Sequence, residues 1–215
     1  MTVSFTYGIG IWTGTLRADD VAVRTIEKAL RTAEASGDHY AVDVVKFLVG
    51  CALLLRGAEG DRSRGLDLLA QLRETWTQQR YGLTELPLLD VYVGREKARG
   101  GDLDGGIRLI RKSLDDMWTR DQVPYYTRTT CVLVETLLDR GADGDAAEAE
   151  AAISRLAAEP SDGSVIVDVW LLRLRALLAR AHGDDAAYRD YRDRYRAMAT
   201  SLGFEGHMEW AEAMP

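Results

Sequence analysis

The sequence predicts an all-α fold, arranged as a right-handed solenoid of antiparallel helix pairs. Three observations lead to this prediction. Helix-favouring residues dominate the composition and there are only four prolines. Short Gly-Asp or Ala-Asp steps recur at nearly even intervals, and apolar residues follow each step at helical spacing.

The repeated steps are marked by Asp19, Asp61, Asp102, Asp145 and Asp184, at intervals of 42, 41, 43 and 39 residues. A glycine in the left-handed conformation ends one helix, and the aspartate then caps the next by accepting hydrogen bonds from its free N–H groups. A period of this length is typical of helical-repeat arrays. We therefore expect each repeat to be a tetratricopeptide-like hairpin of two helices.

The segments after the steps carry matching apolar stripes, as in Leu66, Leu69 and Leu72 or in Ile107, Ile110 and Leu114. Together these signals predict a single helical-repeat domain over residues 1–215, with about five helix pairs and a capping helix. The expected pairs are 4–16 with 19–36, 39–57 with 61–80, 85–99 with 102–119, 124–141 with 145–158, and 165–182 with 184–202, and the cap is 205–213.

The first pair looks incomplete, because residues 4–16 contain two glycines and several β-prone residues. Its apolar residues Phe5, Tyr7, Ile11 and Trp12 have no earlier repeat to pack on. We therefore expect the chain to continue a longer array, or to self-associate through this N-terminal repeat.

Charge and hydropathy exclude several classes of protein. The net charge of −7 argues against general nucleic-acid binding. The longest apolar run, Phe47 to Leu55, is too short to cross a membrane. Cys51 and Cys131 both lie in apolar helical stretches, which predicts buried free thiols in a reducing, cytoplasmic compartment.

No combination of residues indicates catalysis, a metal site or a cofactor. His39, His182 and His207 lack ligand spacing, and we expect them at the surface or at helix ends. Most acids have an arginine or lysine three or four residues away, as Asp190 has Arg194, which predicts solvated ion pairs rather than a catalytic carboxylate pair. The acids weighed for such a pair are Glu74, Asp115, Asp116 and Glu135.

Stacked first helices of a solenoid form its concave face, and aromatic and arginine side chains anchor many interfaces. The candidate groove residues on these helices are Tyr92, Arg95, Arg99, Tyr126, Arg128, Trp170, Arg173 and Arg180. The alternative is that these residues only pack between repeats.

Two stretches, Val132 to Ala158 and above all Leu171 to Pro215, resemble the C-terminal helical-repeat region of large mycobacterial multidomain regulators. Those proteins join a class III adenylate cyclase domain, a P-loop ATPase module and a tetratricopeptide-like tail. The resemblance implies that this chain is the tail of such a signalling protein. It implies no cyclase or ATPase activity here, because the sequence contains no phosphate-binding loop.

The favoured function is therefore a non-catalytic, regulatory scaffold that binds a protein or peptide partner in the groove. The alternative is a sensor domain that binds a metabolite or peptide there. An unrecognised enzyme is the third hypothesis.

Overall fold

The computed structural model describes residues 2–80, 82, 85–159 and 163–215, and over these ranges all the regular elements are helices, with no strand. The prediction of an all-α fold is confirmed. Each predicted helix boundary lies within three residues of the observed one. The helices are α1 (Thr2–Thr13), α2 (Asp20–Ser36), α3 (His39–Arg56), α4 (Asp61–Gln79), α5 (Leu86–Arg99), α6 (Leu103–Thr119), α7 (Val123–Arg140), α8 (Asp145–Ala158), α9 (Val165–Ala181), α10 (Asp185–Leu202) and α11 (Glu205–Glu212).

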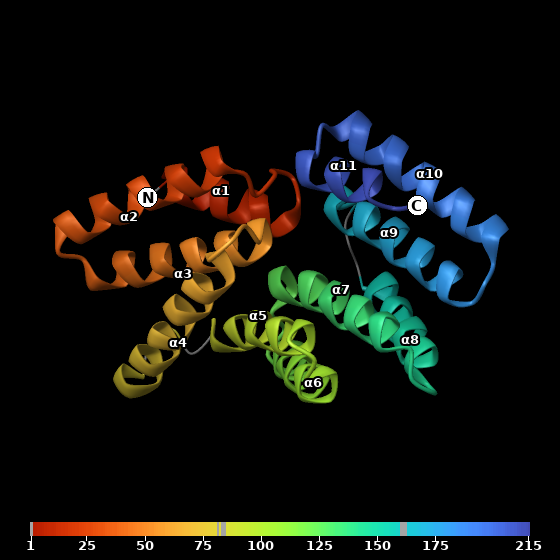
Figure 1. Cartoon of the computed structure of the whole chain (residues 1–215), viewed down its shortest axis with the longest axis horizontal. Coiled ribbons are helices and arrows are strands. Elements are labelled where there is room, and N and C mark those ends of the chain that lie inside the picture. The colour runs from red at the N-terminus through yellow and green to blue at the C-terminus, as the bar shows by residue number, and fades with distance from the viewer. Residues whose placement is uncertain (1, 81, 83–84, 160–162) are drawn as a thin grey trace. The chain divides into compact units, whose positions relative to one another are not determined.

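Helices pack mainly on their neighbours in the chain (Figure 1), as in α1–α2, α2–α3 and α3–α4, and again in α6–α7 and α7–α8. Other contacts skip one helix, as where α1 packs on α3 and α7 packs on α9. Such contacts are expected when the first helices of successive hairpins stack on one another. The handedness and the superhelical geometry of the solenoid remain predictions. Among the described residues, no helix is both long enough and apolar enough to span a membrane.

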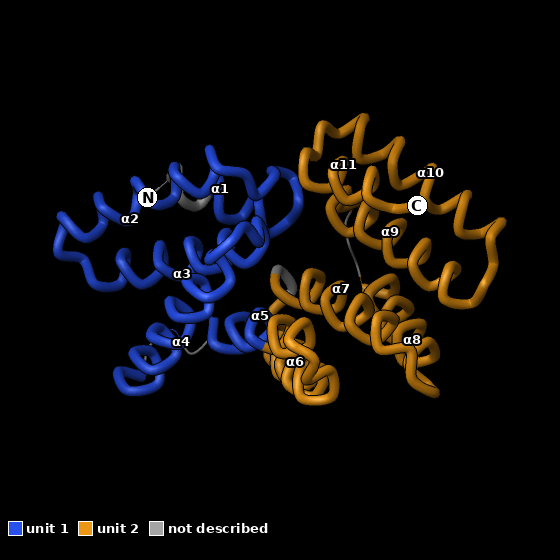
Figure 2. The backbone as a smooth tube through the Cα atoms, in the orientation of Figure 1, with its two compact units in different colours: residues 1–93 blue, residues 94–215 orange. Residues whose placement is uncertain are grey.

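The chain divides into two compact units, residues 1–93 and residues 94–215, and α5 crosses the division (Figure 2). Unit 1 has a core in which Ile11 of α1 packs with residues such as Ile26 and Val49. The core at the C-terminal end of unit 2 contains Val169 and Tyr195. That the units form one repeat domain over residues 1–215 stays a prediction.

Three of the five expected aspartate caps are confirmed. The carboxylates of Asp19, Asp102 and Asp184 accept hydrogen bonds from the backbone N–H groups three residues later, at 2.8, 2.9 and 2.9 Å. Asp38, at the junction between two helix pairs, caps α3 in the same way at 3.1 Å. These caps satisfy N–H groups that have no partner inside their own helices.

The expected capping role is wrong for Asp61 and Asp145. Each is the first residue of its helix, because the preceding glycine, Gly60 or Gly144, takes the N-cap position with φ of 78° or 89°. Such positive φ values suit glycine, which has no Cβ to clash. The carboxylates point back across the turn and accept the backbone N–H of Ala58 and Ala142, at 3.0 and 2.8 Å.

Each of these carboxylates is also held by the arginine that ends the preceding helix, and we call this arrangement the arginine clip. Arg56 Nε and Nη2 donate to Asp61 at 2.7 and 2.6 Å, and Nη1 donates to Asp20 of α2 at 2.8 Å. Arg140 donates in the same way to Asp145 and to Asp104 of α6. Each clip therefore joins the two helices of a hairpin to the second helix of an earlier hairpin.

The first helix also differs from the expectation that its apolar residues lack a packing partner. Ile11 is only 2% exposed and lies in the core of unit 1, with Tyr7 packed against that core. The helices α2 and α3 supply the contact that we had assigned to a missing repeat, since α1 packs on both. The side chain of Phe5 lies outside the described residues.

Candidate functional site

A row of alternating charges runs over the first helices of the hairpins in unit 2. Glu135 of α7 accepts two hydrogen bonds from Arg173 of α9, from Nε at 3.2 Å and from Nη2 at 2.9 Å. On its other side, Arg95 of α5 lies 3.9 Å from Glu135. The three side chains are 15–19% exposed, so the row is largely buried but open to solvent along one edge.

The electrostatics of the row are set by Glu135. Burial favours its neutral form, but the charges of Arg173, Arg128 and Arg95 outweigh this effect and lower the pKa of Glu135 to about 2. Asp139 lies one turn further along α7, and burial together with the negative charge of Glu135 raises the pKa of that carboxyl. The charge on Glu135 is therefore fixed at neutral pH by the arginines around it.

Arg128 lies two turns before Glu135 on α7 and packs against two tryptophan rings whose centroids are 5.1 Å apart. Its Cζ is 4.9 Å from the ring centroid of Trp170 and 5.6 Å from that of Trp210 in α11. Arg173 also contacts Trp210, at 5.8 Å. Guanidinium groups bind to tryptophan faces in this range because the ring face carries negative charge.

The position of Trp210 depends on a buried hydrogen bond under α11. The Tyr195 hydroxyl lies 2.9 Å from His207 Nδ1 and donates to the backbone oxygen of His207 at 3.1 Å. Burial raises the pKa of Tyr195. His207 is 0% exposed, so its predicted place at the surface or a helix end is wrong, since four aromatic rings enclose it. His39 is exposed at the start of α3, and His182 is the exposed C-cap of α9, as expected.

The structure brings together four of the eight predicted groove residues, namely Arg95, Arg128, Trp170 and Arg173. The other four lie outside this cluster. Tyr92 is buried in unit 1, Arg99 donates to Glu96 at 2.5 Å, Tyr126 stacks on Trp118 at 3.8 Å, and Arg180 lies 6.0 Å from the ring of Tyr188.

Sequence reasoning missed two members of the site, Glu135 and Trp210. Glu135 was grouped with solvated acids, although it stands in the apolar run Cys131 to Leu138, which was a signal of burial. Trp210 could not be placed, because its role depends on where α11 docks. The expectation of a solvated pair is confirmed for Asp190 and Arg194, whose charged atoms are 3.2 Å apart at the surface.

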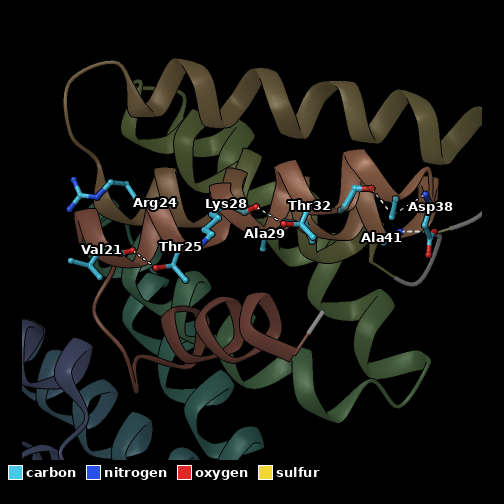
Figure 3. Close-up of a pocket in the computed structure, with 11 residues that line it drawn as sticks. Val21, Arg24, Thr25, Lys28, Ala29, Thr32, Asp38 and Ala41 are labelled. Atoms are coloured by element: carbon cyan, nitrogen blue, oxygen red, sulfur yellow. Dashed lines mark hydrogen bonds between the residues drawn. The ribbon is translucent and has the colours of Figure 1, made fainter.

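A second candidate site is a groove of about 780 Å³ in unit 1, along α2 and the first turns of α3 (Figure 3). Its floor contains Ala29 and Val45, and Arg24 and Lys28 lie on its rim. Val21, at one end, is 57% exposed. The hydroxyls that line the groove donate to their own helix, as Thr25 does to the backbone oxygen of Val21 at 2.7 Å, so the groove offers mainly positive charge and apolar surface.

Cys51 and Cys131 are buried free thiols, as predicted, and burial raises the pKa of Cys131. Within the described ranges, no group of three or more histidine, cysteine, aspartate or glutamate side chains is arranged to hold a metal ion.

Three charged positions of α7 in unit 2 correspond to uncharged positions of α3 in unit 1. Arg140 and Asp145 of the second clip lie 84 positions after Arg56 and Asp61 of the first. The same displacement relates the α7 residues Arg128, Glu135 and Asp139 to Val44, Cys51 and Leu55 of α3. The hairpin therefore forms with either an apolar or a charged stripe at these positions.

Comparison with known proteins adds no relative: the chain matches no protein-family model, no curated protein and no solved structure.

Proposed function

We propose that the chain is a non-catalytic protein-interaction scaffold. Its binding surface is the charged face of unit 2, which consists of the row Arg95, Glu135 and Arg173 together with Arg128, and this face binds a protein or peptide partner. The observation that carries this proposal is the concentration of arginine and tryptophan side chains around Glu135, on the stacked helices α7 and α9 and the end of α5. Arginine and tryptophan are the residue types that most often supply the binding energy of interfaces.

The comparison between the two units supports a functional reason for these charges. Burying charged groups is unfavourable unless they are well paired, and apolar residues of similar volume are often as stable. The α3–α4 hairpin has Val44, Cys51 and Leu55 at the corresponding positions and forms the same clip. The charges on α7 are thus not a requirement of the hairpin.

Binding of the full chain to an array of randomised peptides tests the proposal. The informative variant is Arg95→Ser on α5, and the control is Arg108→Ser, an exposed arginine on α6 that lies outside the charged row. We expect the first variant to lower peptide affinity about tenfold or more and the control to leave it unchanged. Equal losses in both variants, or no peptide bound by the unaltered chain, would contradict the proposal.

A small-ligand sensor is the second candidate, and the groove along α2 favours it. Its volume of about 780 Å³ lies within the range of small-molecule sites. A thermal-shift screen with nucleotides, sugars and short peptides should then show stabilisation that Thr32→Trp abolishes, because the larger side chain fills the groove from an exposed position. A screen without any stabilisation would reject this candidate.

The resemblance to the repeat tails of cyclase–ATPase regulators suggests the kind of partner. We propose that it is a catalytic signalling module, in the same polypeptide or in an associated one, and that the compartment is the cytoplasm. The reading frame before Met1 tests the first possibility directly, since an ATPase or cyclase module encoded there would place both in one chain.

A further inference from the structure

Arg128 packs against the rings of Trp170 and Trp210, and at least one of its N–H donors is left without a hydrogen bond. The side chain is 4% exposed, and its Nε is enclosed without a hydrogen-bond partner in the described part of the chain. Over the same residues, no carboxylate lies within ion-pair distance of the guanidinium. A guanidinium has five N–H donors, and leaving a buried charge without hydrogen bonds is strongly unfavourable.

Glu135, whose pKa Arg128 helps to lower, is already engaged by other arginines. It accepts both hydrogen bonds from Arg173, and Arg95 lies 3.9 Å away on its other side. Arg128 acts on Glu135 only through the longer-range attraction between their charges. The positive charge of Arg128 therefore has no carboxylate of its own.

The contacts with the tryptophan rings leave the in-plane N–H groups of Arg128 able to bind a ligand. The rings of Trp170 and Trp210 lie against the guanidinium at 4.9 and 5.6 Å, and a guanidinium that stacks on aromatic rings keeps its in-plane N–H groups for planar acceptors. A carboxylate is such an acceptor and can bind two N–H groups at once. The charge of Arg128 acts on Glu135, whose row with Arg95 and Arg173 is 15–19% exposed, so a ligand of Arg128 would enter from this row.

We propose that Arg128 is a binding site for a carboxylate, supplied by an aspartate or glutamate side chain of a peptide partner. The site rests on the proposed scaffold function and specifies the chemistry of its partner. The tryptophans hold the guanidinium, and Glu135 orients Arg173 beside it, so the incoming acid meets a preformed donor group. Apolar residues next to that acid pack against the half-buried ring of Trp210.

The experiment compares the full chain with Arg128→Met on an array of randomised peptides that contain or lack acidic residues. Arg155→Met is the matched control, because Arg155 also stacks on a tryptophan of unit 2, Trp118, at 4.0 Å, outside the charged row. We expect the unaltered chain and the control to prefer acidic peptides. Arg128→Met should bind those peptides ten- to a hundredfold more weakly, the usual effect of losing hydrogen bonds to a charged group.

The outcomes separate this site from the general scaffold function. Peptide binding without a preference for acids, or a preference that survives Arg128→Met, overturns the carboxylate site and leaves the scaffold function in place. The absence of any peptide binding overturns both. If Arg128→Met does not fold, Arg128→Lys takes its place, because lysine keeps the positive charge but lacks the planar guanidinium. The carboxylate site then requires that the unaltered chain prefers acidic peptides and that Arg128→Lys loses this preference. Stronger competition by inorganic phosphate than by a hexaglutamate peptide also overturns the proposal, in favour of a phosphate ligand.

Discussion

The hairpins α3–α4 and α7–α8 have the same clip but different first helices. In each, an arginine at the end of the first helix binds the aspartate that begins the second helix, and the same arginine reaches an aspartate on an earlier helix. The stripe on α3 is apolar, whereas the corresponding stripe on α7 carries Arg128, Glu135 and Asp139. The clip therefore belongs to the architecture, and the stripe varies independently of it.

A second difference shows how little the sign of a surface charge matters to this architecture. In unit 1, Glu27 of α2 pairs with Arg64 of α4 at 2.6 Å. In unit 2, the positions 84 residues later hold Arg111 of α6 and Glu148 of α8, which pair at 2.8 Å with the charges exchanged. In both units, second helices of successive hairpins thus carry opposite charges at these positions, in either order.

The largest expected effect is at Glu135. Glu135→Leu leaves Arg173 and Arg95 without their shared carboxylate, so we expect it to lower the free energy of unfolding by about 2–4 kcal/mol. Cys51→Ala, at the corresponding position of unit 1, removes only one sulfur atom and should cost about 1 kcal/mol. Urea unfolding followed by far-UV circular dichroism measures both. Equal losses would mean that the charged row contributes no more to stability than its apolar counterpart.

The pH dependence of stability is the second test. The pKa of Glu135 is about 2 in the folded state, against an ordinary value of 4.5, so below pH 4.5 the unfolded state takes up a proton that the folded state resists. Stability contributed by Glu135 is present above pH 4.5 and is lost as the pH falls towards 2, by about 2 kcal/mol at pH 3. Urea midpoints should therefore fall more steeply with acid in the unaltered chain than in Glu135→Gln, and parallel curves would contradict the lowered pKa.

The two clips should respond alike. Asp61→Ala and Asp145→Ala each remove the buried acceptor of one backbone N–H and two arginine N–H groups, and we expect each to lower the free energy of unfolding by about 1–2 kcal/mol. The comparison predicts that the two losses agree within about 0.5 kcal/mol. If urea unfolding shows no loss of stability for one of the two variants, the two clips contribute differently to the free energy of unfolding despite their shared geometry.

The smallest effect is expected at the exchanged ion pair. Glu27→Arg alone or Arg64→Glu alone brings like charges together and should cost about 0.5 kcal/mol, because Arg64 is exposed. The double variant has the order of charges found in unit 2 and should restore stability. A double variant as unstable as the sum of the single variants, by thermal unfolding, would show that this position depends on more than charge sign.

The fold was largely predictable because its signals are local. Helix ends depend on nearby glycines and capping aspartates, and apolar stripes depend only on helical spacing. The roles of Asp61 and Asp145 were the exception, although both follow a glycine, as the capping residues Asp102 and Asp184 do. Gly60 and Gly144 take the cap themselves, and the partner of each aspartate is an arginine that belongs to the previous helix.

The candidate site was predictable only in part. Residue type and position on first helices pointed to Arg95, Arg128, Trp170 and Arg173, which do meet. The central acid, Glu135, has no arginine or lysine three or four residues away, and it was missed because its partners lie on α5 and α9.

The sequence by itself determined where the helices begin and end and which residues face a neighbour, because capping and amphipathic spacing act within a few residues of the chain. Only the tertiary structure decided which charges are buried together, which arginine stacks on which tryptophan, and that Arg128 pairs with none of the acids in the described ranges. Those outcomes depend on contacts between residues tens of positions apart, which the packing of one helix on another brings into reach.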